Sequence, residues 1–163
     1  MLVGEENAGW RLITTQLNHE RVMLGPAGRL EGLRDLVAEW ASERGLLELP
    51  DVHDVLARVT ATFRINELLN WQVASATGGG VEAIADSSAS KVLASDAVQG
   101  LGMDLHDLVA RHGDPSDPET AYLLHYLDLT AKRNLVLTFG GGVNEVQREL
   151  IAQFGLGLPR VPR

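Results

Sequence analysis

The stretch WRLITTQLNHERVML, residues 10–24, has the periodicity of an amphipathic helix. Its large apolar residues recur at steps of three or four from Trp10 to Leu17, which places them on one helix face. The next position on this face is Glu20, and Arg21 stands beside it. The stretch therefore predicts a core-facing helix with one carboxylate in its apolar face.

A carboxylate in apolar surroundings has two interpretations. Burial is costly unless the group is paired, hydrogen-bonded or neutral, so Glu20 could form a salt bridge between helices or lie at the edge of the face. Burial also raises the pKa of a carboxyl group and makes it a usable general base near neutral pH. The helix alone leaves the structural and the catalytic interpretation open.

The apolar pattern continues to residue 44 through Leu30, Leu33, Val37 and Trp40. It predicts a long helix over residues 8–44. Gly25, Pro26 and Gly28 interrupt the pattern. Pro26 removes a backbone hydrogen bond and predicts a kink about one turn after Glu20. The alternative is two separate helices with a break at this point. Gly45 ends the element.

Three more long helices and a short one follow. Asp51 is expected to cap the first of them, and residues 135–142 lack a helical pattern. The short connections favour antiparallel neighbours. The fold class predicted is all-α, an antiparallel four-helix bundle with an extra short C-terminal helix. The helices are expected at residues 51–75, 81–112 and 119–134 and from residue 144 onward, with apolar faces that include Val52, Val59, Phe63, Ile65, Val98, Leu101, Leu105, Leu108, Val146 and Phe154.

The composition excludes several classes of function. The chain has 163 residues, a formal net charge of −8 and no cysteine, so disulfides and thiolate catalysis are ruled out. No basic stripe supports nucleic-acid binding. No apolar run is long enough for a membrane span, and the N-terminus has no targeting pattern. We expect a cytoplasmic protein.

The five histidines form no HExxH motif and no convincing ligand pair, so no metal site is predicted. The glycine run Gly140–Gly142 directly precedes a helix. Glycines permit a ligand to approach the backbone, and a helix start offers free N–H groups to an anion. A plain tight turn explains the same residues.

Several stretches together resemble one family. Residues 2–10, LVGEENAGW, and 17–28, LNHERVMLGPAG, resemble the start of the C-terminal helical domain of acyl-CoA dehydrogenases. Residues 90–113 are similar to the third helix of that domain, and residues 139–160, with FGGGVNEVQRELIA and GLGLPR, to its end. The resemblance implies a connector at residues 1–9 and the helical bundle domain at residues 10–163.

The resemblance implies an activity and its catalytic base. The family removes hydrogens from Cα and Cβ of an acyl-CoA, with a carboxylate that takes the α-proton and FAD that takes the β-hydride. Many members carry this carboxylate in a Tyr-Glu-Gly-Thr segment, whose Glu position matches Gly141 here. The isovaleryl and long-chain types carry it in a Glu-Arg pair, which matches Glu20 and Arg21. The implied catalytic residues are Glu20 and Arg21.

The resemblance also implies ligands and partners. FAD contacts are expected at Gly141, Gly142, Val143 and Asn144, although FAD binding by this domain alone is not expected. Further partners are an acyl-CoA, an electron acceptor such as electron-transfer flavoprotein, and other subunits in a homo- or hetero-oligomer, as a dimer or tetramer. No nucleic acid or membrane is expected to bind.

One motif departs from the family. A Gln followed by Gly-Gly usually contacts the FAD of a neighbouring subunit, and the matching positions here hold Asp107 and Ala110-Arg111. A carboxylate would repel a pyrophosphate. This favours a subunit of a heteromeric actinobacterial steroid or fatty acyl-CoA dehydrogenase with half the usual flavin. Competing hypotheses are a noncatalytic assembly domain and an unrelated helical regulator.

Overall fold

The computed structural model describes residues 3–23, 27–78 and 83–160, and within these ranges the side chains of residues 14, 18–23, 27, 77 and 78 lie outside the description. All regular elements in the described ranges are helical. They are α1 (Gly9–Met23), α2 (Ala27–Glu43), α3 (Pro50–Gly78), α4 (Ile84–His112), α5 (Pro118–Asn134), the 3₁₀ helix η1 (Leu135–Thr138), α6 (Asn144–Leu150) and the π-helix η2 (Ile151–Gly155).

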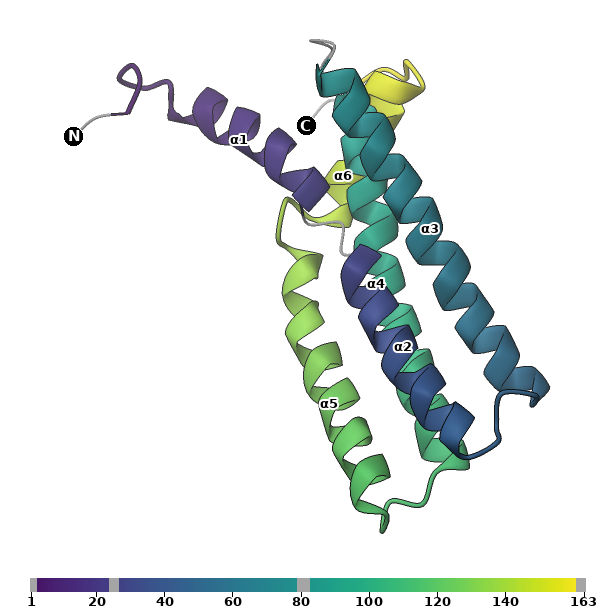
Figure 1. Ribbon diagram of the computed structural model, residues 1–163. Coiled ribbons are helices and arrows are strands. Elements are labelled where there is room, and N and C mark those ends of the chain that lie inside the picture. Colours follow the sequence, from purple (N-terminus) through teal and green to yellow (C-terminus); the bar gives the residue numbers. More distant parts are fainter. Residues whose placement is uncertain (1–2, 24–26, 79–82, 161–163) are drawn as a thin grey trace.

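The helices α2, α3, α4 and α5 form an antiparallel bundle in which α4 contacts each of the other three (Figure 1). α6 and η2 pack on one end of α4, away from the α4–α5 connection (Figure 1). The predicted all-α fold class, an antiparallel bundle with a short C-terminal helix, is therefore confirmed.

The segment expected as one long N-terminal helix over residues 8–44 contains α1, which is described up to Met23, and α2, which is described from Ala27. The expected kink at Pro26 and the alternative of two helices with a break both concern residues 24–26, which lie outside the described residues. Both stay predictions.

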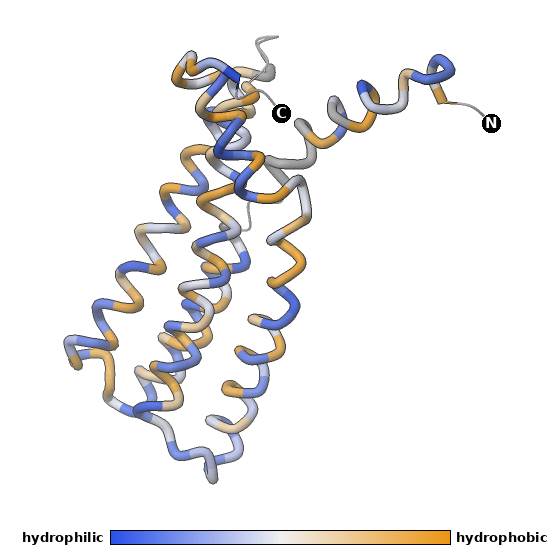
Figure 2. The backbone as a smooth tube through the Cα atoms, turned by 180° about the vertical axis from the view of Figure 1, so that it is seen from behind, coloured by the Kyte–Doolittle hydropathy of each residue, from blue (hydrophilic) through white to orange (hydrophobic). Residues whose placement is uncertain are grey.

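The apolar face expected on α1 is only partly buried. Trp10 is 80% exposed and Ile13 is 43% exposed, which corrects the expectation of a core-facing helix. The reason is the direction of α1, which leaves the bundle and touches it at one end, through α4 and α3 (Figures 1 and 2).

The bundle core agrees closely with the predicted faces. Leu30, Leu33, Val37 and Trp40 of α2 are all buried. So are most of the predicted residues of α3 and α4: Val52, Val59, Phe63, Val98, Leu101, Leu105 and Leu108. Burial of these side chains supplies the main driving force for folding, about 1.5–3 kcal/mol for each large one.

Three predicted core residues are exposed instead. Ile65 on α3, Val146 on α6 and Phe154 on η2 are between 39% and 60% exposed. Asn66, next to Ile65, is buried. The buried face of α3 thus runs at ordinary helical spacing through Phe63, Asn66 and Val73, and the prediction of Ile65 is off by one position.

Two helix ends show how local chemistry shapes the connections. Gly45 has a φ of +67°, and the N–H groups of Gly45 and Leu46 donate to the carbonyls of Ser42 and Ala41 at the end of α2. This is the glycine-dependent helix stop that the sequence predicts. Asp51 is not the cap of α3, because it lies inside the first turn of that helix.

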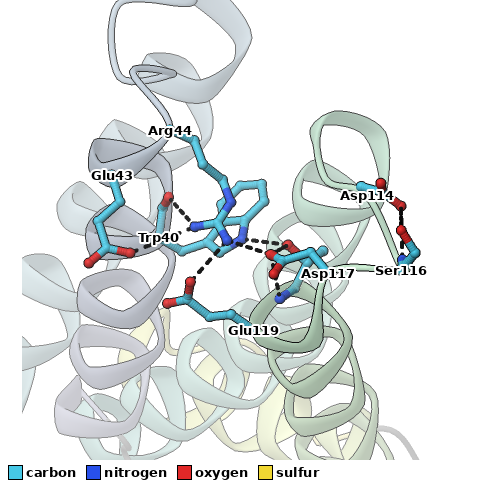
Figure 3. A network of polar contacts seen from close by, with 8 residues as sticks. Trp40, Glu43, Arg44, Asp114, Ser116, Asp117 and Glu119 are labelled. Carbon is cyan, nitrogen blue, oxygen red and sulfur yellow. Dashed lines mark hydrogen bonds and ion pairs between the residues drawn. The ribbon is translucent and has the colours of Figure 1, made fainter.

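A polar clamp joins the end of α2 to the start of α5 (Figure 3). The Arg44 guanidinium lies 2.6 Å from Asp117 Oδ2 and 2.9 Å from Glu119 Oε2, and stacks on the Trp40 ring at 5.0 Å. Asp117 caps α5 by accepting from the backbone N–H of Thr120. Hydrogen bonds from the Thr120 hydroxyl and from Arg44 lower the pKa of Asp117 from 3.8 to about 2.

Among the described residues, no helix combines the length and apolar character that a membrane span requires.

Candidate functional site

The predicted base Glu20 and its neighbour Arg21 belong to α1, near its C-terminal end. Their side chains lie outside the described residues. The helix that carries them contacts α4. α6, which directly follows the predicted glycine turn, also packs against α4. Both segments of the predicted site therefore contact the same helix.

The glycine turn has a conformation that other residues rarely adopt. Gly141 and Gly142 have φ values of +73° and +96°, and the Gly142 N–H donates to the Phe139 carbonyl at 3.0 Å. Left-handed backbone of this kind favours glycine. The turn therefore presents backbone rather than side chains, which fits the predicted close approach of a ligand.

Gln147 supports the turn from one helical turn further on. Its side chain is fully buried, and Nε2 donates to the Gly141 carbonyl at 3.2 Å. A Cβ added to Gly142 would lie 2.5 Å from the same Nε2. The φ of Gly142 favours glycine, and a side chain there would displace Gln147 Nε2 from its hydrogen bond to the Gly141 carbonyl.

The second polar atom of Gln147 is an unused acceptor. Oε1 is buried and has no hydrogen-bond partner among the described residues. A buried acceptor in this state is uncommon and calls for a donor. The hydroxyl and N–H groups of a flavin cofactor are donors, so the turn fits the flavin end of FAD on this count. α6 is too short, at seven residues, to act as a phosphate-binding helix start.

Asn144 is the centre of a polar cluster between α4 and α6. Its Oδ1 accepts from Lys91 Nζ at 2.6 Å and lies 3.0 Å from Ser95 Oγ. Its Nδ2 donates to Asp96 Oδ1 at 2.7 Å, and Arg148 donates to the other Asp96 oxygen at 2.8 Å. The amide of Asn144 is therefore held on both sides by α4, which leaves its side chain committed to the protein.

The polar residues of this cluster were not all foreseen. Asn144 was predicted as a site residue, whereas Lys91 and Gln147 were not, although both are at most 2% exposed. The only local indication of this cluster in the sequence is a lysine within the small-residue stretch of residues 83–95. The Lys91–Asn144 pairing spans 53 residues, so no spacing rule along the chain predicts it.

The remaining predicted positions lie elsewhere. Asp107, which matches the Gln position of the family motif, is exposed on the last turns of α4. Ala110 and Arg111 follow on the same helix, and Arg111 pairs with Asp51 of α3 at 3.0 Å. No cluster of three metal-ligand side chains occurs in the described part of the chain.

The sequence pattern of the family "Acyl-CoA dehydrogenase, C-terminal domain" matches residues 7–156. The chain therefore belongs to the acyl-CoA dehydrogenase family, whose members depend on FAD, and corresponds to the C-terminal domain of that family. The resemblance read from residues 2–28 and 139–160 is confirmed.

A curated protein and a solved structure are similar to this chain over nearly its whole length. The chain is 55% identical over 168 residues to the acyl-CoA dehydrogenase FadE29 of Mycobacterium tuberculosis, covering 100% of this chain and 43% of that protein. It is similar to the solved structure of the Tcur3481–Tcur3483 steroid ACAD, with 39% identity and a TM-score of 0.84 over 98% of this chain and 42% of that one.

A second solved structure is the ChsE4–ChsE5 complex from Mycobacterium tuberculosis, with 38% identity and a TM-score of 0.81, covering 98% of this chain and 43% of that one. The chain thus spans less than half the length of the relatives it matches. The similarity supports the predicted relation to heteromeric actinobacterial steroid acyl-CoA dehydrogenases.

Proposed function

We propose that this chain supplies the C-terminal bundle of an FAD-dependent acyl-CoA dehydrogenase that introduces an α,β double bond into an acyl-CoA thioester. The observation that carries the proposal is the shared packing on α4 of α1, which holds Glu20, and α6, which follows the Gly140–Gly142 turn. By itself the 163-residue chain would be inactive, because it matches less than half of a complete relative.

In this proposal Glu20 is the catalytic base and Arg21 its cationic neighbour. A proton on the carbon next to a thioester is weakly acidic, and a desolvated carboxylate of raised pKa is suited to remove it. Gly141 stands at the other position where the family carries its base, and it offers no functional group. Glu20 is thus the candidate that remains from the family pattern.

FAD is the proposed cofactor, and when bound it would accept the hydride from Cβ. Backbone of Gly141, Gly142 and Val143 would lie against it, and the free Oε1 of Gln147 would accept one of its donors. Asn144 would take part indirectly, since its amide already contacts α4. The electron acceptor would be an electron-transfer flavoprotein or a similar carrier.

We further propose that the full protein works with an unlike partner subunit on a steroid acyl-CoA. Two similar structures have names that pair two proteins, and one of them is called a steroid ACAD. The exposed carboxylate of Asp107 agrees with loss of pyrophosphate binding on this subunit. The expected cytoplasmic location stays a prediction.

A noncatalytic assembly role is the second candidate. It is favoured by an apolar outer face on α2 and α5, where Tyr122 and Tyr126 stack at 6.5 Å and Leu36 is 43% exposed. Exposed aromatic and aliphatic groups of this kind are typical of protein interfaces.

The experiment is a Glu20→Gln substitution in the full-length protein, produced together with any partner subunit. Dehydrogenation should fall roughly 100- to 10,000-fold, the usual contribution of a general base, while flavin content and assembly mass stay unchanged. Glu48→Gln, an exposed loop residue, is the matched control. Unchanged turnover in the Glu20 variant would exclude the base and leave the assembly role.

The partner proposal needs its own measurement. Titration of the apoprotein with FAD should give about one tight site per pair of unlike subunits. One tight site on each subunit of a homodimer would contradict a mixed assembly.

A further inference from the structure

Lys91 is an almost fully buried cation on α4. Its side chain is 2% exposed and lies in α4 between the bundle core and α6. Burial of an ammonium group is costly unless it is paired and hydrogen-bonded. One of its contacts is the 2.6 Å hydrogen bond to Asn144 Oδ1, which is short and charge-assisted.

Asn144 connects Lys91 to the glycine turn. It is the first residue of α6, and only Val143, in extended conformation with ψ 150°, separates it from Gly142. The Asn144 side chain is fixed by α4 through Lys91, Ser95 and Asp96. The C-terminal end of the turn is therefore tied to α4.

The other anchor of the turn lies within α6. Gln147 holds the Gly141 carbonyl from within α6. Because α6 is itself anchored at Asn144, both hydrogen bonds depend on the same starting residue. A shift of Asn144 would displace the backbone of Gly141 and Gly142 together with Gln147.

We propose that Lys91 is a positioning residue, which holds Asn144 and through it fixes the Gly141–Val143 turn relative to α4. The inference rests on the proposed function in one respect, since the turn is taken to face acyl-CoA and flavin. Lys91 would not touch either ligand. Its role would be to keep the backbone of the turn within the narrow range that a productive complex allows.

The first test is hydrogen–deuterium exchange on the full-length protein with Lys91→Met, which keeps the length of the side chain and removes its charge. Amides of residues 139–147 should exchange about tenfold faster or more, whereas amides in α2 and α5 keep their rates. The thermal midpoint should change little, because Asn144 Oδ1 is neutral and keeps the hydrogen bond from Ser95 Oγ.

These readouts separate positioning from a general structural role. A structural lysine would lower the thermal midpoint and speed exchange throughout the bundle, and that result would overturn the proposal. Unchanged exchange in residues 139–147 would overturn it as well. Lys132→Met is the matched control, because Lys132 is an exposed lysine of α5 that pairs with Asp128 at 2.6 Å.

A double-mutant cycle tests the path through Asn144. Lys91→Met and Asn144→Ala should each speed exchange in residues 139–147, and the double variant should be little faster than either single variant. Additive effects would show that Lys91 acts by another route and would overturn the proposal.

Activity then distinguishes this inference from the proposed function. In an active enzyme, Lys91→Met should lower kcat about tenfold or more with a smaller change in KM. Faster exchange with unchanged turnover would keep the tie to Asn144 but contradict a positioning role in catalysis. Failure of the proposed function itself would appear separately, as full activity in Glu20→Gln.

Discussion

The indole Nε1 of Trp40 donates to Thr120 Oγ1 at 3.0 Å, and this bond joins α2 to α5 across 80 residues. Both side chains are at most 1% exposed. The Thr120 hydroxyl in turn donates to Asp117 Oδ2, which also accepts a hydrogen bond from the Arg44 guanidinium. A buried ring, a hydroxyl and an ion pair thus form one connected clamp.

Trp40→Phe should destabilise the bundle by about 1 kcal/mol, because it removes the hydrogen bond and keeps most of the apolar volume. Trp40→Ala should cost roughly 3–5 kcal/mol through the cavity it leaves. Urea unfolding of the chain, followed by helical circular dichroism, measures both values. Equal losses for the two variants would contradict the contribution of ring packing.

Acid should weaken the same clamp. The pKa of Asp117 is lowered from 3.8 to about 2 in the folded chain, so its stabilising contribution is complete above about pH 4 and is lost as the pH falls toward 2. The thermal midpoint of the wild type should therefore approach that of Asp117→Asn over this range. A gap between the two that is independent of pH would contradict the assignment.

Gly142→Ala should disrupt the glycine turn. Its φ of +96° is strained for alanine, and a Cβ would displace Gln147 Nε2, which lies 2.5 Å away, so we expect a loss of roughly 1–3 kcal/mol. Gly100→Ala is the control, since a Cβ there meets nothing within 4 Å and alanine favours a helix. Unfolding curves of both variants check the prediction, and equal stability would refute it.

Asn66→Leu should raise stability by about 1 kcal/mol. Asn66 is 2% exposed, its Nδ2 makes a long 3.4 Å contact with Ser90, and its Oδ1 has no partner among the described residues. Leucine has a similar shape without the unsatisfied atom. Asn70→Leu should do the opposite, because Ser90 donates to Asn70 at 2.6 Å. Denaturant midpoints of the two variants should move in opposite directions.

Helical periodicity predicted the bundle well because the helices that cover the bundle core all belong to this chain. Val37, Val59 and Leu105 recur at helical spacing and are fully buried. Trp10 follows the same pattern and is exposed. Periodicity states that a face is apolar, but it does not state which element covers that face, and α1 extends away from the bundle.

The site was predictable only where one residue type is required locally. A glycine run before a helix indicated the turn, and the positive φ values of Gly141 and Gly142 explain that signal. The tie between Lys91 and Asn144 depends on how α6 docks on α4, which no sequence spacing encodes. The role of Glu20 stays a prediction from the family pattern.

The Arg44–Asp117 clamp and the Gly140–Gly142 turn lie at opposite ends of the bundle (Figure 1). Under the proposed function, stability and catalysis would therefore depend on different ends of the domain. Substitutions around Arg44 would change the temperature at which the bundle unfolds and leave the proposed site intact.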